Sequence, residues 1–269
     1  MTKVWALTGK HYFIATIGFV VWFISAVLLP VLLNFPHWGD IQDVWARWQT
    51  LNAGMLALAA SIIAFRAVGL RDESEARRNL IATKPFLPEQ LSALTTYNRH
   101  CFKSFAAAWN YLDKNSSSGV VEIDGLVVPE LPDDYRSVFR DLIKYAPEGL
   151  SNYLSVILAE LQIHDARLRS LPKQLADTNT IVFPISVMDY IRNLGVLQAR
   201  LNALFPFARG EVAEFGINPM TVRDLREAIS VGGIEIDEIN QLKEYLEPAV
   251  KRANRKVLPD PADVLGESD

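Results

Sequence analysis

The chain has 269 residues, of which 50% are hydrophobic and 22% are charged, and its formal net charge is −4. This acidic balance argues against nucleic-acid binding, which depends on a basic patch or stripe. The single cysteine, Cys101, excludes an intramolecular disulfide and any cysteine-based metal site. The charges are unevenly divided: residues 1–70 hold only four basic and two acidic side chains. We therefore expect the chain to have two parts, a charge-poor N-terminal part and a highly charged remainder.

The first predicted element is an uncharged apolar run over residues 12–33, YFIATIGFVVWFISAVLLPVLL. As a helix it would extend roughly 33 Å at ~1.5 Å per residue, enough to cross a hydrocarbon core of about 30 Å. A cleaved signal peptide has an apolar region of only about 7–15 residues and a small-residue cleavage site. Neither feature fits this run, so we predict a retained transmembrane helix.

The second predicted element is a transmembrane helix over about residues 47–70. Its apolar part carries no charge from Thr50 to Phe65. Tryptophans precede this stretch, as they do at membrane–water interfaces, because the indole ring has an apolar body and a polar edge. The predicted interfacial anchors among them are Trp38, Trp45 and Trp48.

Two further features favour a membrane span over its alternative, a buried core helix or an interfacial helix. Arg66 lies near the end of the apolar stretch, where its side chain can reach the lipid headgroups. Small residues recur every four positions, and such a face lets two helices approach closely in lipid. The predicted packing face consists of Ala53, Ala57 and Ser61, and a homo-oligomer formed through this second span is one expected association.

The two spans and the intervening residues 34–47 make a helical hairpin that occupies residues 1–70. Basic residues are frequent at its two outer ends and rare in the connecting loop, which holds Arg47 alone. The Lys/Arg bias orients such a hairpin with its basic ends inside. We therefore predict a multi-pass protein of a bacterial inner membrane with both termini in the cytoplasm. The flanking basic residues are Lys3, Lys10, Arg66, Arg71, Arg77, Arg78 and Lys84.

Residues 71–256 are predicted to form a cytoplasmic all-α bundle of about six helices. The segment from residue 71 continues the second span as a helix and stops before Pro85. Apolar residues then recur with helical spacing in three segments, which predicts one buried face on each. The first face holds Leu91, Leu94, Cys101, Phe102, Phe105 and Leu112. The second holds Tyr135, Val138, Phe139, Leu142 and Ile143, and the third holds Leu150, Tyr153, Leu154, Ile157, Leu158 and Leu161.

The remaining predicted elements follow from pairs of turn-forming and helix-capping residues. VVEIDGLVV, residues 120–128, has the Asp-Gly centre of a two-residue β-hairpin inserted between helices. Later helices are expected near 181–205, 219–230 and 236–255. Asn218 and Pro219 are the predicted N-cap and first-turn pair, and Gly232–Gly233 separates the last two helices. The tail, 257–269, is predicted to be disordered.

The sequence predicts no catalytic, cofactor-binding or metal-ligating residues. The sequence has no phosphate-binding loop, no dinucleotide fingerprint and no nucleophile elbow. His164 and Asp165 are adjacent but lack further metal ligands nearby in the sequence, so a solvated or core-edge histidine is the preferred interpretation. Cys101 falls on the apolar face of its helix, which favours a packed thiol over a nucleophile.

The stretch WQTLNAGMLALAASIIAFRAV and the later KPFLPEQLSALTTY carry a resemblance over about residues 45–98. They resemble a loose group of bacterial two-span inner-membrane proteins. These proteins share a Trp- or Phe-Gln-Thr-Leu start, a Gly- and Ala-rich span, an Arg near its end and an Ala- and Leu-rich LP-x-x-L helix. The resemblance implies an inner-membrane setting and a helical cytoplasmic region, and it implies no activity.

The preferred functional hypothesis is a non-enzymatic, membrane-anchored interaction or scaffold protein. Its expected partners are the lipid bilayer, an unidentified cytoplasmic protein and a second copy of the chain, with no nucleic acid and no cofactor. One alternative is a membrane effector or sensor, of the stress or phage-defence type, that acts through oligomerisation of the hairpin. The other is an enzyme with a site assembled from dispersed residues.

Overall fold

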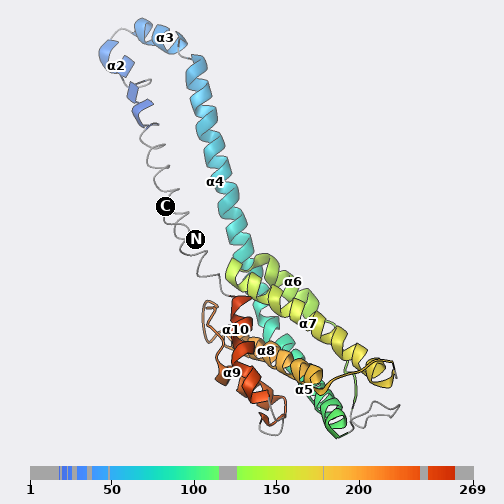
Figure 1. Ribbon diagram of the computed structural model, residues 1–269. Coiled ribbons are helices and arrows are strands. Elements are labelled where there is room, and N and C mark those ends of the chain that lie inside the picture. The colour runs from blue at the N-terminus through green and yellow to red at the C-terminus, as the bar shows by residue number, and fades with distance from the viewer. Residues whose placement is uncertain are drawn as a thin grey trace. The chain divides into compact units, whose positions relative to one another are not determined.

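The computed structural model describes residues 18, 20–22, 24–25, 29–34, 38–47, 49–114, 126–177, 179–236 and 242–257. The chain divides into two units, residues 1–73 and residues 74–269. Throughout the described ranges the regular structure is helical and no strand occurs, which confirms the all-α class (Figure 1).

The first unit holds α2 (Leu29–Asn34), α3 (Trp38–Arg47) and the first part of α4 (Gln49–Thr83). Among the described residues one helix, beginning at Gln49, is long and apolar enough to cross a membrane. Half of the first predicted span, 12–33, lies outside the described residues. The segment 34–47 was predicted to be a loop, but most of it forms the helix α3.

The apolar side chains of α4 are exposed, and they point to every side of the helix. The large apolar side chains that are exposed between residues 51 and 70 have exposed fractions of 44% to 81%. They are Leu51, Leu56, Leu58, Ile62, Ile63, Phe65, Val68 and Leu70. At 100° per residue these eight positions leave one sector of about 120°, and alanines such as Ala53 and Ala57 occupy it, so α4 has no polar face along this stretch. As predicted, the helix continues beyond residue 71 and stops before Pro85, where the 3₁₀ turn η2 (Lys84–Phe86) begins.

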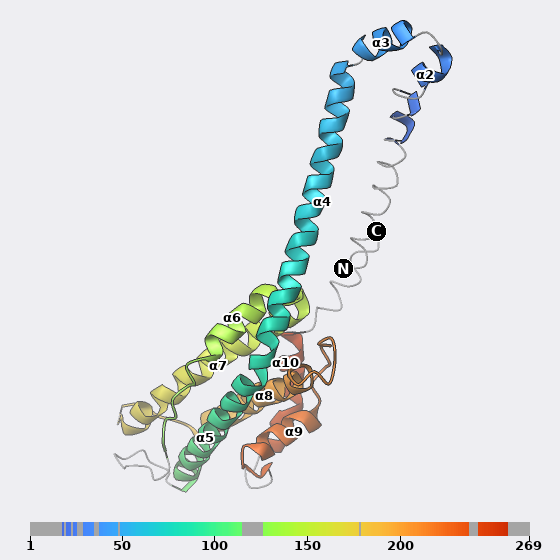
Figure 2. The same cartoon turned by 180° about the vertical axis from the view of Figure 1, so that it is seen from behind.

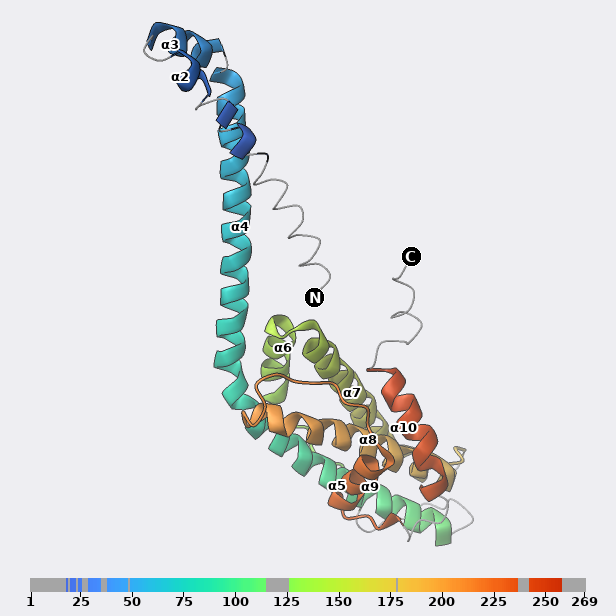
Figure 3. The same cartoon turned by 90° about the vertical axis from the view of Figure 1, so that its left-hand side faces the viewer.

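Six α-helices follow within the described part of the second unit, in agreement with the predicted number. They are α5 (Leu87–Lys114), α6 (Tyr135–Tyr145), α7 (Glu148–Ala176), α8 (Pro184–Ala208), α9 (Val222–Val231) and α10 (Leu246–Arg255), the last preceded by the 3₁₀ turn η4 (Leu242–Tyr245). The centre of the unit is α8, because 15 of its 25 residues are buried. It packs against α5, α7, α9 and α10. Figure 3 shows α5 and α8 running side by side, and Figure 2 shows α9 near the C-terminal helix.

The core confirms the predicted apolar faces. All six predicted positions of α5 are buried, from Leu91 to Leu112. In α6 and α7 the predicted side chains are buried or packed against the core from its edge, and these two helices contact each other as neighbours joined by a short turn. The helical spacing of apolar residues therefore predicted which side of each helix is buried. Each helix has one wide apolar face, and packing against its neighbours removes that face from water.

Three local predictions differ from the structure. Leu126–Val128 forms no strand, and the centre of the predicted hairpin lies outside the described residues. The N-cap of α9 is Thr221, so the prediction of Asn218 and Pro219 is wrong. Thr221 Oγ1 accepts a hydrogen bond from the amide of Asp224, and the Asp224 carboxylate accepts one from the Thr221 amide. This reciprocal pair satisfies two amides at once, which an Asn-Pro start does not.

The last predicted helix, 236–255, is shorter in the structure. The turn η4 starts at Leu242 and α10 ends at Arg255, while residues 237–241 are outside the described ranges. The predicted Gly-Gly break is confirmed, because α9 ends with Gly232 as its C-cap. Gly233 has φ +84°, a left-handed conformation that glycine adopts without steric cost. The predicted disordered tail falls, apart from Val257, outside the described residues.

Candidate functional site

A cleft of about 340 Å³ opens among α7, α8 and α10. Its walls combine apolar side chains with an unusual number of charges. The charged lining residues are Glu160, Arg167, Asp189, Arg192, Arg252 and Lys256. Four of these six are basic, although the chain as a whole is acidic. The cleft is therefore a locally cationic, concave surface.

Helical spacing explains why these residues share one cleft. From α7 come Glu160, Ile163, His164 and Arg167; from α8 come Asp189, Arg192, Asn193 and Val196; from α10 and its C-cap come Ala249, Arg252, Ala253 and Lys256. Each set has the spacing i, i+3, i+4 and i+7, which places its members on one face of a helix. Three such faces meet where the three helices pack.

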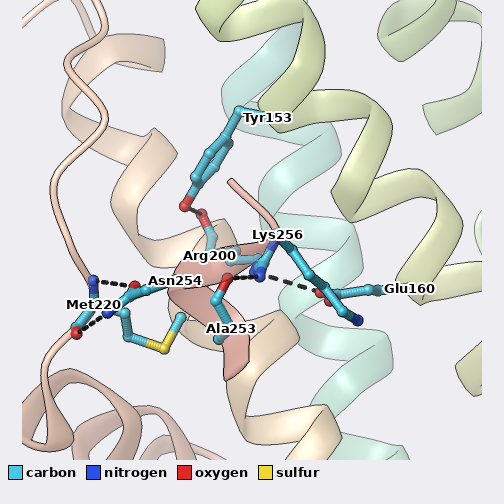
Figure 4. Close-up of polar contacts among 7 residues, drawn as sticks. All are labelled: Tyr153, Glu160, Arg200, Met220, Ala253, Asn254 and Lys256. Atoms are coloured by element: carbon cyan, nitrogen blue, oxygen red, sulfur yellow. Dashed lines mark hydrogen bonds and ion pairs between the residues drawn. The ribbon is translucent and has the colours of Figure 1, made fainter. Parts of the chain in front are cut away.

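A buried arginine, Arg200, does not line the cleft but contacts two residues that do, Ala253 and Glu160 (Figure 4). Its side chain is only 1% exposed, and its Nη2 donates a 2.8 Å hydrogen bond to the carbonyl oxygen of Ala253. Its Nε lies 3.4 Å from Glu160 Oε2. The Tyr153 hydroxyl donates a 3.2 Å hydrogen bond to the Arg200 carbonyl oxygen. These contacts tie α7, α8 and α10 to one another through α8.

Glu160 interacts with two cations. Besides the Arg200 guanidinium, the Lys256 ammonium donates a 3.1 Å hydrogen bond to Glu160 Oε1. A buried charge such as that of Arg200 is costly unless it is paired. The Glu160 carboxylate therefore neutralises part of the charge of Arg200 and Lys256. It offers little negative charge to the rest of the cleft.

Arg192 is the second buried guanidinium, with a side chain only 7% exposed. Its Nη1 lies 2.9 Å from Asp189 Oδ1, an ion pair across one helical turn. Its Nε is buried and has no hydrogen-bond partner among the residues that the structure describes. Burial lowers the pKa of Arg192, the Asp189 carboxylate opposes this, and the nearby Arg252 guanidinium lowers the pKa further. The cleft thus contains a desolvated cation beside a second cation.

His164 separates the cleft from the core. It is 6% exposed, so the expectation of a solvated side chain is wrong and that of a core-edge position is right. Its ring meets Phe105 edge-on at a centroid distance of 5.3 Å, and its Nε2 is without a hydrogen-bond partner in the described structure. Burial lowers the pKa of His164 to about 4, although the Asp165 carboxylate opposes the shift. The imidazole is therefore neutral at pH 7 and adds no charge to the cleft.

The residues singled out from the sequence lie elsewhere, in the first unit. Ala53, Ala57 and Ser61 are exposed on one face of α4, and Ser61 Oγ donates a 2.8 Å hydrogen bond to the Ala57 carbonyl oxygen. Arg66 is exposed on the same helix. The positions of Trp38 and Trp45 fall in α3, but their side chains and the whole of Trp48 are outside what the structure describes.

Metal and thiol chemistry find no support among the described residues. They contain no group of three or more His, Cys, Asp or Glu side chains placed to hold a metal ion. Cys101 is fully buried, which confirms the predicted packed thiol, and burial raises its pKa to about 12. At neutral pH the thiol stays protonated, so its nucleophilicity is low.

The sequence holds only a partial signal for the cleft, because it does not show that the faces of α7, α8 and α10 meet. Each of its three walls is a polar stripe with helical spacing beside an apolar one, and a polar stripe on a helix ordinarily faces water.

The comparisons add no assignment: no protein-family model, curated protein or solved structure matches this chain.

Proposed function

We propose that the protein is a membrane-anchored interaction protein of a bacterial inner membrane, which presents its helical second unit as a docking module in the cytoplasm. The observation that carries this proposal is the exposed apolar surface of α4. A monomeric soluble protein rarely exposes an apolar patch of this extent. Residues 50–70 extend about 31 Å as a helix, which matches a hydrocarbon core of about 30 Å.

The proposed orientation rests on the flanking charges. Basic residues follow the apolar part of α4, whereas the preceding loop has only Arg47. This bias places the second unit on the cytoplasmic side. The resemblance of residues 45–98 to two-span inner-membrane proteins supports the same arrangement. A first span over 12–33, with both termini in the cytoplasm, completes the proposed hairpin.

A two-position labelling experiment tests this topology. In a Cys101→Ala background, single cysteines are placed at Gly39 in α3 and at the exposed Ser155 in α7. Intact cells with a permeabilised outer membrane are treated with a maleimide that cannot cross the inner membrane. We expect Gly39→Cys to react at once and Ser155→Cys to react only after lysis. Recovery of the chain in the soluble fraction, or reaction of both positions on the same side, contradicts the proposal.

Two matched substitutions test whether lipid surrounds α4. Ile63 in α4 and Ile181, which precedes α8, are 69% and 72% exposed, so each can be changed to lysine without loss of internal packing. A lysine near the centre of a span costs about 3 kcal/mol of insertion free energy. Ile63→Lys should therefore raise the fraction of chains in which both labelled positions lie on one side. Ile181→Lys should leave the labelling unchanged, and equal effects of the two would refute the lipid-facing role of α4.

A further inference from the structure

The cleft among α7, α8 and α10 carries more positive charge than its own carboxylates neutralise. Glu160 is held by Arg200 and Lys256, and Asp189 is held by Arg192. Arg252 makes no ion pair with another described residue, and the Arg167 guanidinium lies over the Tyr190 ring, 5.4 Å from its centroid. Two arginines at this surface are thus left without a carboxylate.

The buried Arg192 gives the cleft a built-in donor. Its Nε is desolvated and unpartnered among the described residues, although leaving a buried donor unpaired costs free energy. The proximity of Arg252 increases this cost, because two like charges repel. An anion bound in the cleft would offset this repulsion, because both arginines line it.

The size and lining of the cleft restrict the anion. Its volume of about 340 Å³ exceeds the roughly 150 Å³ of an engineered cavity that holds benzene, so the cleft has room for more than a phosphate group alone. Ile163, Tyr190, Val196 and Ala249 supply apolar and aromatic surface beside the cations. An arginine fork matches the oxygens of a phosphate group in two parallel hydrogen bonds. A phosphomonoester carries about two negative charges at neutral pH, which matches the surplus.

We propose that this cleft binds a phosphomonoester with a small organic moiety. Arg192 is the buried anchoring donor, Arg252 is the second cation at the phosphate, and Tyr190 with its apolar neighbours receives the organic part. This binding is independent of the membrane anchor proposed above. The phosphate could belong to a soluble metabolite or to the headgroup of a phosphatidic-acid-like lipid, and the test separates the two.

The first arm of the test uses the full chain in a non-ionic detergent micelle and isothermal titration calorimetry. Adenosine 5′-monophosphate and inorganic phosphate are the probes, with adenosine as the phosphate-free control. We expect the monophosphate to bind and adenosine to bind at least about tenfold more weakly, because adenosine lacks the phosphate oxygens that accept charged hydrogen bonds from the two arginines.

Matched variants locate the binding. Arg252 lines the cleft, whereas Arg255 is exposed on the same helix and does not line it. Arg252→Gln should raise the Kd about tenfold and Arg255→Gln less than about twofold. Arg192→Lys should also weaken binding, since it removes the fork but keeps a charge; if that variant fails to fold, the Arg252 and Arg255 pair still decides.

The second arm places the chain in phosphatidylcholine nanodiscs with or without phosphatidic acid and measures the Tm of the second unit. A rise in Tm with phosphatidic acid that Arg252→Gln abolishes assigns the phosphate to a lipid headgroup. Binding of the monophosphate without such a rise assigns it to a soluble compound. If neither arm shows binding, or if Arg252→Gln and Arg255→Gln have equal effects, the proposal is wrong.

Discussion

A methyl group at residue 232 would test how closely α9 packs on α5. An ideal Cβ there would lie 2.5 Å from Phe102 Cγ and 2.6 Å from Phe102 Cε2, well inside van der Waals contact. Phe102 is fully buried, and its Cγ is the root of a rigid ring rather than the end of a flexible chain. Gly232 has φ −68°, which alanine adopts without strain. The effect of Gly232→Ala is therefore steric alone.

We expect Gly232→Ala to lower the free energy of unfolding by about 3 kcal/mol, the upper end of the cost of overpacking. At a urea dependence of about 2 kcal/mol per molar, the midpoint should fall by about 1.5 M. Cys101 provides the assay in the full chain, because it is the only cysteine, is fully buried and precedes Phe102 directly. The fraction alkylated in a short maleimide pulse at each urea concentration reports the unfolded fraction.

The neighbouring glycine supplies the control. Gly233 has φ +84° and open space around an added Cβ, so Gly233→Ala should cost about 1–2 kcal/mol through backbone strain instead. Phe102→Ala removes the ring, and in that background Gly232→Ala should add almost nothing while Gly233→Ala keeps its full cost. If Gly232→Ala costs the same with and without the ring, the contact between α9 and α5 does not limit this position, and the reasoning fails.

Three further predictions concern charges and caps. The pKa of His164 is about 4 in the folded protein and about 6.5 when unfolded, so the unfolded state binds more protons between these values. The free energy of unfolding should therefore fall by up to about 3 kcal/mol as pH drops from about 6.5 to about 4. Urea titrations at several pH values should show that this fall is smaller in His164→Gln. Thr221→Ala should cost about 1 kcal/mol through loss of the α9 cap, measured by the same titration. Arg200→Met should cost about 1–3 kcal/mol, because the Ala253 carbonyl oxygen loses its donor while Glu160 keeps Lys256. The double variant with Glu160→Gln should cost less than the two single changes together, because the two side chains interact.

The sequence contained the information for most of the core. Leu91, Phe102 and Phe105 repeat with helical spacing, and a stripe of this kind is buried wherever the helix packs, because removal of apolar surface from water drives folding. The start of α9 was also encoded locally, in Thr221 and Asp224. The wrong prediction gave weight to the proline at residue 219 and overlooked a capping box two residues later.

The cleft could not be predicted in the same way, because its residues come from distant parts of the chain. Arg200 donates to a carbonyl 53 residues later and meets a carboxylate 40 residues earlier. Within its own segment it is a charged residue between apolar neighbours, with no local partner that would explain it. Which polar stripes face one another depends on how α7, α8 and α10 pack, and that is a property of the whole fold.

The helices α4 and α8 show why one sequence pattern admits two environments. Neither helix has a polar face along its whole length, although α8 carries the polar stripe that lines the cleft. The apolar sides of such helices must be covered either by protein or by lipid. For α8 the structure supplies the protein: four helices cover it, and its buried guanidinium groups at Arg192 and Arg200 meet carboxylates on α8 itself and on α7. For the apolar part of α4, none of the candidate span's window is buried. The burial of apolar area that stabilises α8 by packing is left, for α4, to a bilayer or to another protein chain, and the labelling of Gly39→Cys and Ser155→Cys distinguishes the two.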